Sequence, residues 1–542
     1  MQKSLLLGVE AIAQGAIDGG MSGVYAYPGT PSTEITEYVQ HSKQAKELNI
    51  HSDWAANEKT AMESALGMSY AGKRVMVCMK HVGLNVAADC FMNAAITGAN
   101  GGMLIVVADD PSMHSSQNEQ DSRVYGQFAM IPILEPSNQQ EAYDMARFGF
   151  ELSEACEIPV MMRITTRLAH SRAGIARYAE VTAQNKLKLP EDKVQFVLLP
   201  GIARKRYKKL LSNQAKFEAA SEESVYNSYT DSADKSMGII ACGLGYNYLM
   251  ENYPDGNCPY PVVKISQYPI PRTMIKKITS ECDKVMVLEE GYPVIEEILK
   301  GYLEKEAVIG RLDGTLSRDG ELTPDMVGRA LGFEIEESLE VPGIVVPRPP
   351  ALCVGCSHID VYKALNEVIA EYGAGRVFAD IGCYTLGALP PFNAINSCVD
   401  MGASITMAKG AADAGLIPSV AVIGDSTFTH SGMTGLLDAI NEKTPITVII
   451  SDNESISMTG GQKSSAKGKL EAICEGLGVE KEHIHVLLPV PKKHEEIKAV
   501  FRKEFDYNGV SVIIPRRVCV QKNVRDQKNK KAAMAKAVAK AY

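Results

Sequence analysis

The sequence lacks any long apolar segment. No stretch of about 18 uncharged apolar residues occurs in the chain, so we expect no membrane-spanning helix. The apolar run near the N-terminus ends at Glu10, is too short for the core of a signal peptide and has no cleavage site. We therefore expect a cytoplasmic protein.

Positive charge and cysteine are also scarce. The chain has 56 basic and 65 acidic residues, a net charge of −9 at pH 7, which gives no general attraction to nucleic acid. Twelve cysteines among 542 residues are too few for a disulfide scaffold, so we expect thiols or metal ligands. Seven of them stand outside any motif and are expected to be buried thiols: Cys78, Cys90, Cys156, Cys242, Cys258, Cys282 and Cys474.

Length and hydrophobic patterning predict several α/β domains. With 542 residues and 45% hydrophobic content, the chain has the size of a globular protein of three or four domains. Apolar runs at 74–79, 103–108 and 158–162 alternate with helical patterns, as in a parallel sheet that is covered on both faces. We predict a first α/β domain over residues 1–190 and a polar connector over 191–235.

A smaller α/β domain is predicted over residues 236–341. It begins with a strand, a glycine turn and a helix, and strand-like runs follow at 261–265 and 284–290. Gly243 and Gly245 lack the third glycine of a nucleotide-binding fingerprint. We interpret them as a tight turn from strand to helix.

A third α/β domain is predicted over residues 351–520, after a Pro-rich linker at 342–350. The last stretch, 521–542, is rich in Lys and Ala and predicts a surface helix or a frayed tail. The third domain's predicted strands are 376–381, 419–424, 446–451 and 509–515.

Two strands of the third domain end in polar residues. Gly424 and Asp425 follow one strand, and Asp452 and Asn453 follow the next, 28 residues later. Ligands bind at this carboxyl edge in open α/β sheets. Glycine lets backbone approach a diphosphate, and carboxylate and amide oxygens suit Mg²⁺. The spacing is the pattern known for thiamine-diphosphate enzymes, and MTGGQ at 458–462 agrees with it.

At these residues the sequence resembles the 2-oxoacid ferredoxin oxidoreductases, most closely the alpha subunits of the indolepyruvate type. The resemblance covers nearly all of residues 1–520. It rests on these segments: AYPGTPSTEI (26–35), NEKTAMESALGMSYAGKR (57–74), MKHVGLNVAAD (79–89), VADDPSMHSSQNEQDSR (107–123), LCVGCSH (352–358), DIGCYTLGALPP (380–391), MGASITMAKG (401–410) and GDSTFTHSG (424–432).

The resemblance implies a fold and a cofactor. Two doubly wound thiamine-diphosphate-binding domains would flank a smaller βαβ domain like the transketolase C-terminal domain. The first would bind the aminopyrimidine, and the third the diphosphate with Mg²⁺ on Asp425, Asn453 and Ser455. The further residues implied in cofactor binding are Gly382, Tyr384, Gly402, Gly424 and Ser426.

The catalytic residues are implied in the same way. Glu58 matches the family's activating glutamate, although a solvent-facing glutamate near a helix start is equally ordinary. Thr30 resembles the family threonine near the substrate, and His81 and His114 are either proton relays or structural hydrogen-bond donors. Arg123 could pair with a substrate carboxylate or form an interface ion pair.

Cysteine spacing gives a separate indication. Cys353 and Cys356 form a C-x₂-C motif, Cys383 follows after 26 residues, and Cys519 is assigned to the last strand. Related oxidoreductases hold a 4Fe-4S cluster on this pattern. Zinc with help from His358, or unliganded thiols, would also fit.

The implied activity is oxidative decarboxylation of an arylpyruvate with CoA to an acyl-CoA. The sequence has no C-x₂-C-x₂-C run that could hold a further cluster. Electrons would therefore leave from the single cluster to ferredoxin or another separate acceptor. A small beta/gamma-type subunit would complete a heterotetramer. The alternatives are a non-oxidative 2-oxo acid decarboxylase and a catalytically idle scaffold, which the presence of Glu58, Asp425 and Asn453 disfavours.

Overall fold

The computed structural model describes residues 3–192, 195–196, 198, 200–301, 306–317, 320–335, 342–346, 350–398, 401–413 and 416–541. The chain divides into two compact units, Met1–Leu339 and Glu340–Tyr542. Within the described residues, no helix is long and apolar enough to cross a membrane.

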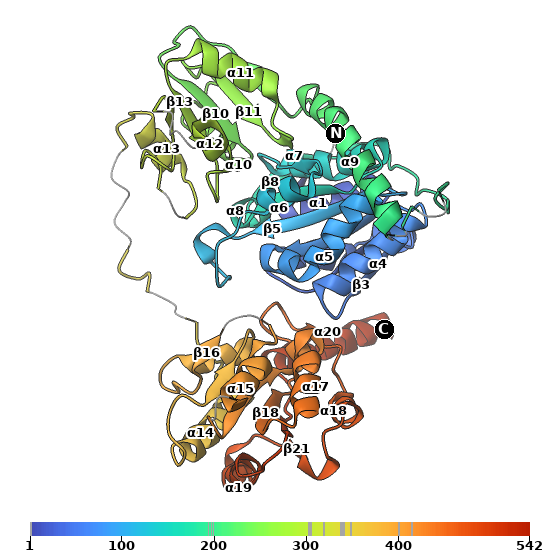
Figure 1. The fold of residues 1–542 in the computed structure, drawn as a ribbon, viewed down its shortest axis with the longest axis vertical. Helices are drawn as coiled ribbons and strands as arrows, with labels where there is room; N and C mark the ends of the chain where they lie inside the picture. The colour runs from blue at the N-terminus through green and yellow to red at the C-terminus, as the bar shows by residue number, and fades with distance from the viewer. Residues whose placement is uncertain are drawn as a thin grey trace. The chain divides into compact units, whose positions relative to one another are not determined.

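A seven-stranded sheet forms the centre of the first unit (Figure 1). All neighbours pair in parallel except β12 (Gln267–Tyr268), which is antiparallel to β6 (Ile133–Leu134). Every residue of the three long central strands is buried, as expected of a sheet covered on both faces. The strand order is β12 (Gln267–Tyr268), β6 (Ile133–Leu134), β7 (Val160–Thr165), β5 (Met103–Asp109), β4 (Val75–Lys80), β2 (Gly23–Ala26) and β3 (His51–Trp54).

Helices cover this sheet in two layers (Figure 1). α1 (Gly8–Asp18) packs against α7 (Gln139–Cys156), and α4 (Glu58–Tyr70) packs against α5 (His81–Thr97). A two-stranded antiparallel ribbon lies beside them, formed by β1 (Lys3–Leu7) and β8 (Arg172–Ala176). The other helices around this sheet are α2 (Thr33–His41), α3 (Lys43–Glu47), α6 (Ser122–Ala129) and α8 (Thr166–His170). The strands predicted from the runs at 74–79, 103–108 and 158–162 are confirmed, and the first domain is doubly wound.

A five-stranded sheet forms the second part of the same unit. Gly243 forms the turn between β10 (Gly238–Cys242) and α10 (Leu244–Glu251) with φ +48°, and a Cβ there would lie 2.5 Å from Glu135 Cγ. This confirms the tight turn. The strand order is β14 (Val308–Ile309), β13 (Val285–Leu288), β10 (Gly238–Cys242), β11 (Val262–Ile265) and β9 (Ser228–Thr230), and β9 alone is antiparallel to its neighbour. The helices are α11 (Arg272–Glu281), α12 (Val294–Lys300) and α13 (Pro324–Ala330).

The predicted connector at 191–235 contains regular structure. A helix, α9 (Pro200–Glu222), occupies most of it, and β9 joins the five-stranded sheet. Only Leu210, Phe217 and Ser221 of this helix are buried, which explains why its sequence has weak periodicity. Residues 336–341 and 347–349, at the end of the predicted small domain and in the linker, lie outside the described residues.

A buried ion-pair network joins the two sheets of the first unit. Arg123 Nη1 lies 2.9 Å from Glu289 Oε2, and Arg123 Nη2 lies 2.6 Å from Asp121 Oδ2. Arg163 Nε lies 2.6 Å from Asp109 Oδ2, and this arginine also pairs with Glu135. Both arginines are buried. Arg123 therefore forms ion pairs between the two sheets of the first unit, and it also donates to the backbone carbonyl of Tyr292 at 2.9 Å.

The second unit is built on a parallel six-stranded sheet. Its order is β16 (Ser397–Cys398), β15 (Val377–Ala379), β17 (Ser419–Gly424), β18 (Ile446–Ser451), β22 (Ser511–Pro515) and β21 (Ile484–Leu487). Two separate apolar clusters lie on it. One includes residues of α14 (Ser357–Ile369) and α19 (His494–Phe505), and the other includes residues of α15 (Ala403–Asp413), α17 (Met433–Glu442) and α18 (Leu470–Leu477).

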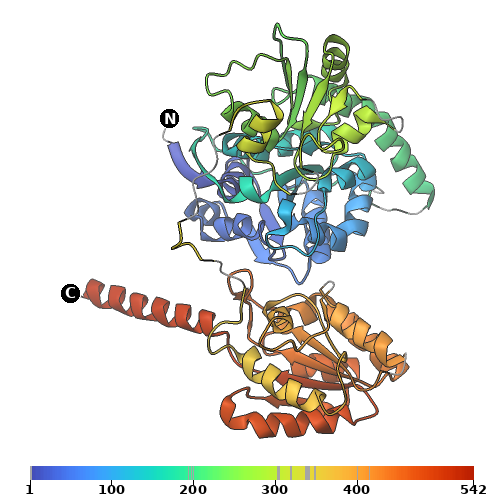
Figure 2. The ribbon, with the colours of Figure 1, turned by 90° about the vertical axis from the view of Figure 1, so that its left-hand side faces the viewer.

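The four strands predicted in this unit are therefore confirmed, as is its doubly wound class. The Lys/Ala-rich end forms a helix, α20 (Val520–Ala541), which extends away from the rest of the second unit (Figure 2). Cys519 lies four residues after the end of β22. Cys519 therefore lies after the last strand and not on it. Beyond Pro515 only an isolated bridge between Asp452 and Arg516 follows, so the regular pairing of the sheet has ended before Cys519.

Candidate active site

Glu58 begins α4 at the carboxyl edge of the seven-stranded sheet. Asn57 caps the helix, and its side chain accepts a hydrogen bond from Thr60 N at 2.8 Å. Glu58 is 5% exposed, so it does not face solvent. A Cβ at Gly83 would lie 2.7 Å from Glu58 Cγ, so glycine allows the carboxylate to lie against the first turn of α5.

Thr30 lies next to a cation that was not anticipated from the sequence. Lys80, the last residue of β4, donates from Nζ to Ser115 O at 2.7 Å, and Ser115 Oγ donates to Thr30 O at 3.2 Å. Burial lowers the pKa of Lys80 to about 8, and nearby Asp110 opposes this shift. The available signal was a lysine that ends a buried apolar strand, directly before His81.

The two candidate histidines occupy different environments. His81 is 1% exposed at the start of α5, and its Nε2 lies 3.2 Å from Asn118 O. Among the described residues, nothing bonds to its buried Nδ1. His114 is half-exposed, and its Nε2 lies 3.2 Å from Glu321 Oε2. His114 therefore contacts the segment that follows the five-stranded sheet, and among the described residues it forms no hydrogen bond or ion pair with Thr30 or His81.

In the second unit, Asp425 begins α16 (Asp425–Thr427) directly after Gly424. Burial raises the pKa of Asp425 to about 7, against a hydrogen bond from Ser464, and the neighbouring Asp452 raises it further. Its Oδ2 is buried without a hydrogen-bond partner in the described part of the chain. A buried acceptor that lacks a donor is stabilised by a cation, so this carboxylate fits a Mg²⁺ ligand.

The next strand end carries the other predicted diphosphate-site residues. Asn453 Oδ1 accepts hydrogen bonds from Ser455 N at 3.1 Å and Ser455 Oγ at 3.3 Å. Ser455 begins β19 (Ser455–Ile456), which packs beside α16. Asp452 pairs with Arg516, Oδ2 to Nε at 2.6 Å. Because Asp452 is already paired with Arg516, Asn453 and Ser455 are the better candidates for binding a metal ion.

Tyr384 packs on the glycine backbone of this edge. A Cβ at Gly424 would lie 2.8 Å from its ring, and Gly382 contacts the same ring. Its hydroxyl donates to Asp380, a residue that was not anticipated as part of the site. Asp380 Oδ2 also accepts from Gly402 N at 3.1 Å, and burial raises the pKa of Asp380 to about 6. Tyr384, Gly382 and Gly402 thus form the floor of the predicted diphosphate site. Ser426, which follows Asp425, is also buried.

The four motif cysteines gather at one part of this edge. Burial raises the pKa of Cys383 to about 12, and the charges of Cys356, Cys519 and Cys353 raise it further. Cys356 N donates to Cys353 O at 2.9 Å, and Arg517 donates to Gly355 O between them. Cys353 is exposed and the other three are half-buried. The position of these thiols is compatible with one cluster.

His358 is not placed as a metal ligand. It is buried, its ring packs edge-on against Tyr384 with centroids 6.2 Å apart, and burial followed by the charge of Arg517 lowers its pKa to about 4.

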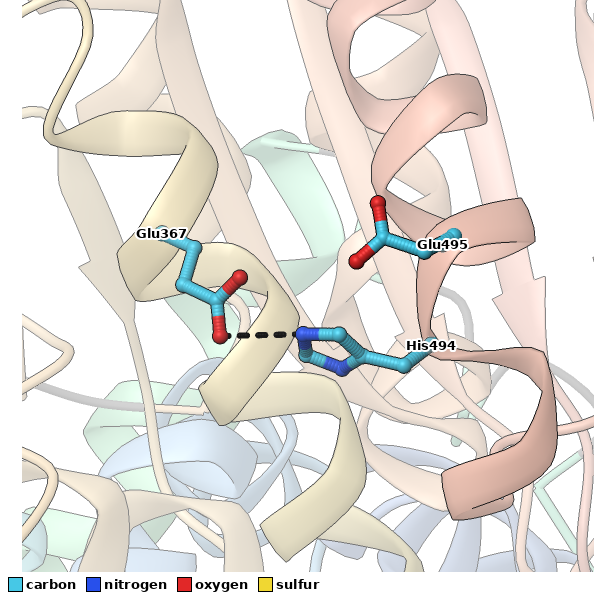
Figure 3. Close-up of side chains that lie close together, drawn as sticks. All are labelled: Glu367, His494 and Glu495. Carbon is cyan, nitrogen blue, oxygen red and sulfur yellow. Dashed lines mark hydrogen bonds and ion pairs between the residues drawn. The ribbon is translucent and has the colours of Figure 1, made fainter.

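Another group of possible metal ligands lies on the surface. Glu367, His494 and Glu495 point toward one another from α14 and α19 (Figure 3), with His494 Nε2 2.9 Å from Glu367 Oε1. Lys498 Nζ already lies 2.8 Å from Glu367 Oε2 and 3.1 Å from Glu495 Oε1. The Lys498 ammonium therefore already pairs with both carboxylates, and the group is a surface ion-pair cluster.

Comparison with known families agrees with this geometry. Residues 14–225 match the family described as "Pyruvate flavodoxin/ferredoxin oxidoreductase, thiamine diP-bdg", and residues 380–514 match "Thiamine pyrophosphate enzyme, C-terminal TPP binding domain". The fold and these matches define a thiamine-diphosphate-binding oxidoreductase of the 2-oxoacid ferredoxin oxidoreductase class.

Individual relatives narrow the assignment. Proteins named "Indolepyruvate oxidoreductase subunit IorA" are 38% identical over 546 residues in Archaeoglobus fulgidus and 35% identical over 563 residues in Pyrococcus abyssi. Each alignment covers 96% of this chain and 86% of the relative. The chain belongs to the indolepyruvate oxidoreductase subunit IorA family, which confirms the resemblance seen in its motifs.

Proposed function

We propose that this chain is the large subunit of an enzyme that oxidatively decarboxylates an aromatic 2-oxo acid. The 2-oxo acid and CoA would give an acyl-CoA, CO₂, a proton and two electrons. The observation that carries this proposal is a hydrogen bond in the second unit, from Cys519 N to Asn453 O at 3.2 Å. It joins the candidate iron-sulfur ligands to the candidate diphosphate site, so electrons released at the cofactor would have a short path to a cluster.

Thiamine diphosphate, when bound, would supply the nucleophilic carbon and the electron sink for decarboxylation. The chain's own groups would hold and activate it. The buried Glu58 carboxylate would hydrogen-bond the pyrimidine N1′, and Asp425, Asn453 and Ser455 would hold the Mg²⁺ and the diphosphate. The unpartnered Asp425 Oδ2 supports the metal assignment. Gly424 would give the diphosphate close access to backbone, above the floor formed by Gly382, Tyr384 and Gly402.

Substrate handling is assigned to the strand ends of the first unit. The buried Lys80 ammonium would neutralise the charge of the 2-oxo acid's carboxylate. Hydrogen bonds through Ser115 link Lys80 to Thr30. His81, with a buried Nδ1 that has no partner among the described residues, is the better placed proton relay. His114 keeps this role only if it leaves Glu321.

The electron path is assigned to one 4Fe-4S cluster on Cys353, Cys356, Cys383 and Cys519. The four thiols lie near enough to one another that the neighbouring cysteines raise the pKa of Cys356 and Cys383, and this proximity supports the assignment. A small subunit would complete a cytoplasmic heterotetramer, and ferredoxin or a similar acceptor would take the electrons. The relatives are themselves named as subunits.

Anaerobic purification tests the whole proposal. The protein should be brown, contain about four irons per chain, bind thiamine diphosphate, and form acyl-CoA from indolepyruvate and phenylpyruvate faster than from pyruvate. A preference for pyruvate or 2-oxoglutarate would refute the aromatic substrate. Colourless, zinc-containing protein that releases only CO₂ and aldehyde would instead establish the non-oxidative decarboxylase.

A further inference from the structure

The surface around Cys519 has an unusual charge for this chain. The whole chain carries a net charge of −9, yet the first fifteen residues of α20, 520–534, contain five basic residues and one acidic residue. Apart from the half-buried Val520 and Lys522, these residues are exposed. The basic residues are Lys522, Arg525, Lys528, Lys530 and Lys531.

The start of this helix is fixed to the candidate cluster and the candidate diphosphate site. Cys519 O accepts a hydrogen bond from Asn523 N at 2.9 Å. Arg525 donates from Nη1 to Gly460 O at 2.5 Å, and Lys522 donates to Glu454 O. Within the described part of the chain, no carboxylate forms an ion pair with Lys528, Lys530 or Lys531. These three lysines are therefore available to a partner.

An apolar patch lies next to the same cysteines. Arg517 donates to Gly355 O and Pro489 O, which holds the loops before α14 and after β21 together. The neighbouring apolar side chains are exposed: Val354 by 99%, Leu488 by 45% and Val518 by 39%. An apolar centre with a charged rim is the usual composition of a transient protein interface.

We propose that this surface, made of Val354, Leu488 and Val518 together with Lys528, Lys530 and Lys531 of α20, is the docking site for a small acidic electron-transfer protein. Charge complementarity selects the partner, because a basic helix attracts an acidic protein and raises its rate of encounter by about 10- to 1000-fold at low salt. The exposed Cys353 lies within the patch, so a docked acceptor would sit beside the candidate cluster. This inference rests on the proposed function for its electron source.

The test uses the anaerobic holoenzyme and an acidic ferredoxin as the probe. The variant Lys528→Glu/Lys530→Glu/Lys531→Glu reverses the helix charge. A matched control, Arg204→Glu/Lys205→Glu/Lys208→Glu on α9, makes the same charge change on exposed residues of the first unit. We expect the ferredoxin Kd, and the KM in turnover, to rise at least about tenfold in the α20 variant alone. The effect should fade toward 1 M salt, where the Debye length is ~3 Å.

Reduction of benzyl viologen by the 2-oxo acid separates docking from chemistry. This small dication gains nothing from a basic helix, so its rate should be the same in both variants. A ferredoxin Kd within twofold of the unmodified enzyme, or an equal loss in the α9 control, would overturn the docking site. So would absence of ferredoxin binding together with lysine-dependent binding to phosphatidylserine vesicles. Helix-dependent ferredoxin binding without any dye reduction would uphold the docking site and refute the proposed chemistry.

Discussion

The two units differ in how their most prominent buried charges are paired. In the first unit, Arg123 and Arg163 are buried and form ion pairs with carboxylates of the same chain. In the second unit, the buried Asp425 has an oxygen without a partner among the described residues, and burial raises the pKa of Cys383. The buried arginines of the first unit are thus paired within the chain, whereas Asp425 and the motif thiols of the second unit would be stabilised by bound cations. This difference predicts where loss of a metal destabilises the protein and where loss of a side chain does.

The first prediction tests the one buried carboxylate of the first unit that we assign to catalysis. Glu58→Gln keeps the shape of the side chain and removes its charge, so turnover should fall at least about 100-fold while thiamine diphosphate still binds. Glu63→Gln, an exposed change on the same helix, should have little effect. Steady-state rates and calorimetric titration of the cofactor measure both. Full activity of Glu58→Gln would remove it from the mechanism.

The second prediction asks whether the thiols of the second unit await iron. Cys383→Ser should lose the brown colour and stop 2-oxo-acid-dependent dye reduction, because serine replaces one thiolate ligand. Cys398→Ser changes a half-buried thiol outside the set and should keep both. Iron analysis and visible spectra are the measurements. Unchanged iron content in Cys383→Ser would show that this residue is not a ligand.

The third prediction concerns Lys80, a buried cation of the first unit that lies outside the ion-pair network of Arg123 and Arg163. Lys80→Met should raise the KM for the 2-oxo acid about 10- to 100-fold, the range expected for loss of a hydrogen bond to a charged group. The kcat should change less, because the carboxylate charge is lost during decarboxylation. Lys80→Arg should rescue part of the loss, and thiamine diphosphate affinity should stay constant.

The same lysine gives a pH dependence. Because the pKa of Lys80 is about 8, its ammonium is present below pH 8 and is lost as pH rises through that value. The KM for the 2-oxo acid should therefore rise above pH 8 in the unmodified enzyme and show no such rise in Lys80→Met. A KM profile that is identical in the two proteins would assign Lys80 to holding Ser115 alone.

The smallest effect is expected on the stability of the metal-free protein. The pKa of Asp425 is about 7 when folded and 3.8 as its ordinary value. Its contribution to stability is therefore full below pH 3.8 and is lost as pH rises through 7. Asp425→Asn should raise the melting temperature at pH 8 by roughly a few degrees and abolish stabilisation by Mg²⁺ with thiamine diphosphate. Asp452→Asn, which removes the partner of Arg516, should lower it.

Much of the fold followed from local patterns in the sequence. The fully buried strands β4, β5, β7, β17 and β18 are short apolar runs, and such runs are visible without long-range information. β3, with the sequence HSDW, has no apolar run and lies at a sheet edge. It was missed because edge strands bury less side chain.

The candidate site was predictable where residue types recur at fixed spacing, and not where burial decides. Asp425, Asn453 and the cysteines belong to motifs, although their roles stay predictions. Lys80 and Asp380 were missed because only tertiary packing shows that they are buried. The use of Arg123 was undecided because its partner Glu289 lies 166 residues away, beyond any local pattern.

The edge strand β12 has a consequence for the order in which the chain is made. Gln267 and Tyr268 of β12 pair with Leu134 and Ile133 and so complete the seven-stranded sheet. In the sequence, β12 comes after the first strands of the small domain. On the ribosome, synthesis at about 5–20 residues per second leaves this sheet without its last strand for several seconds after Leu134 emerges. An expression fragment cut at residue 235 would leave β6 as an open edge, and open edges pair with other chains. The genetic unit that can be shuffled or expressed alone is therefore the whole first unit.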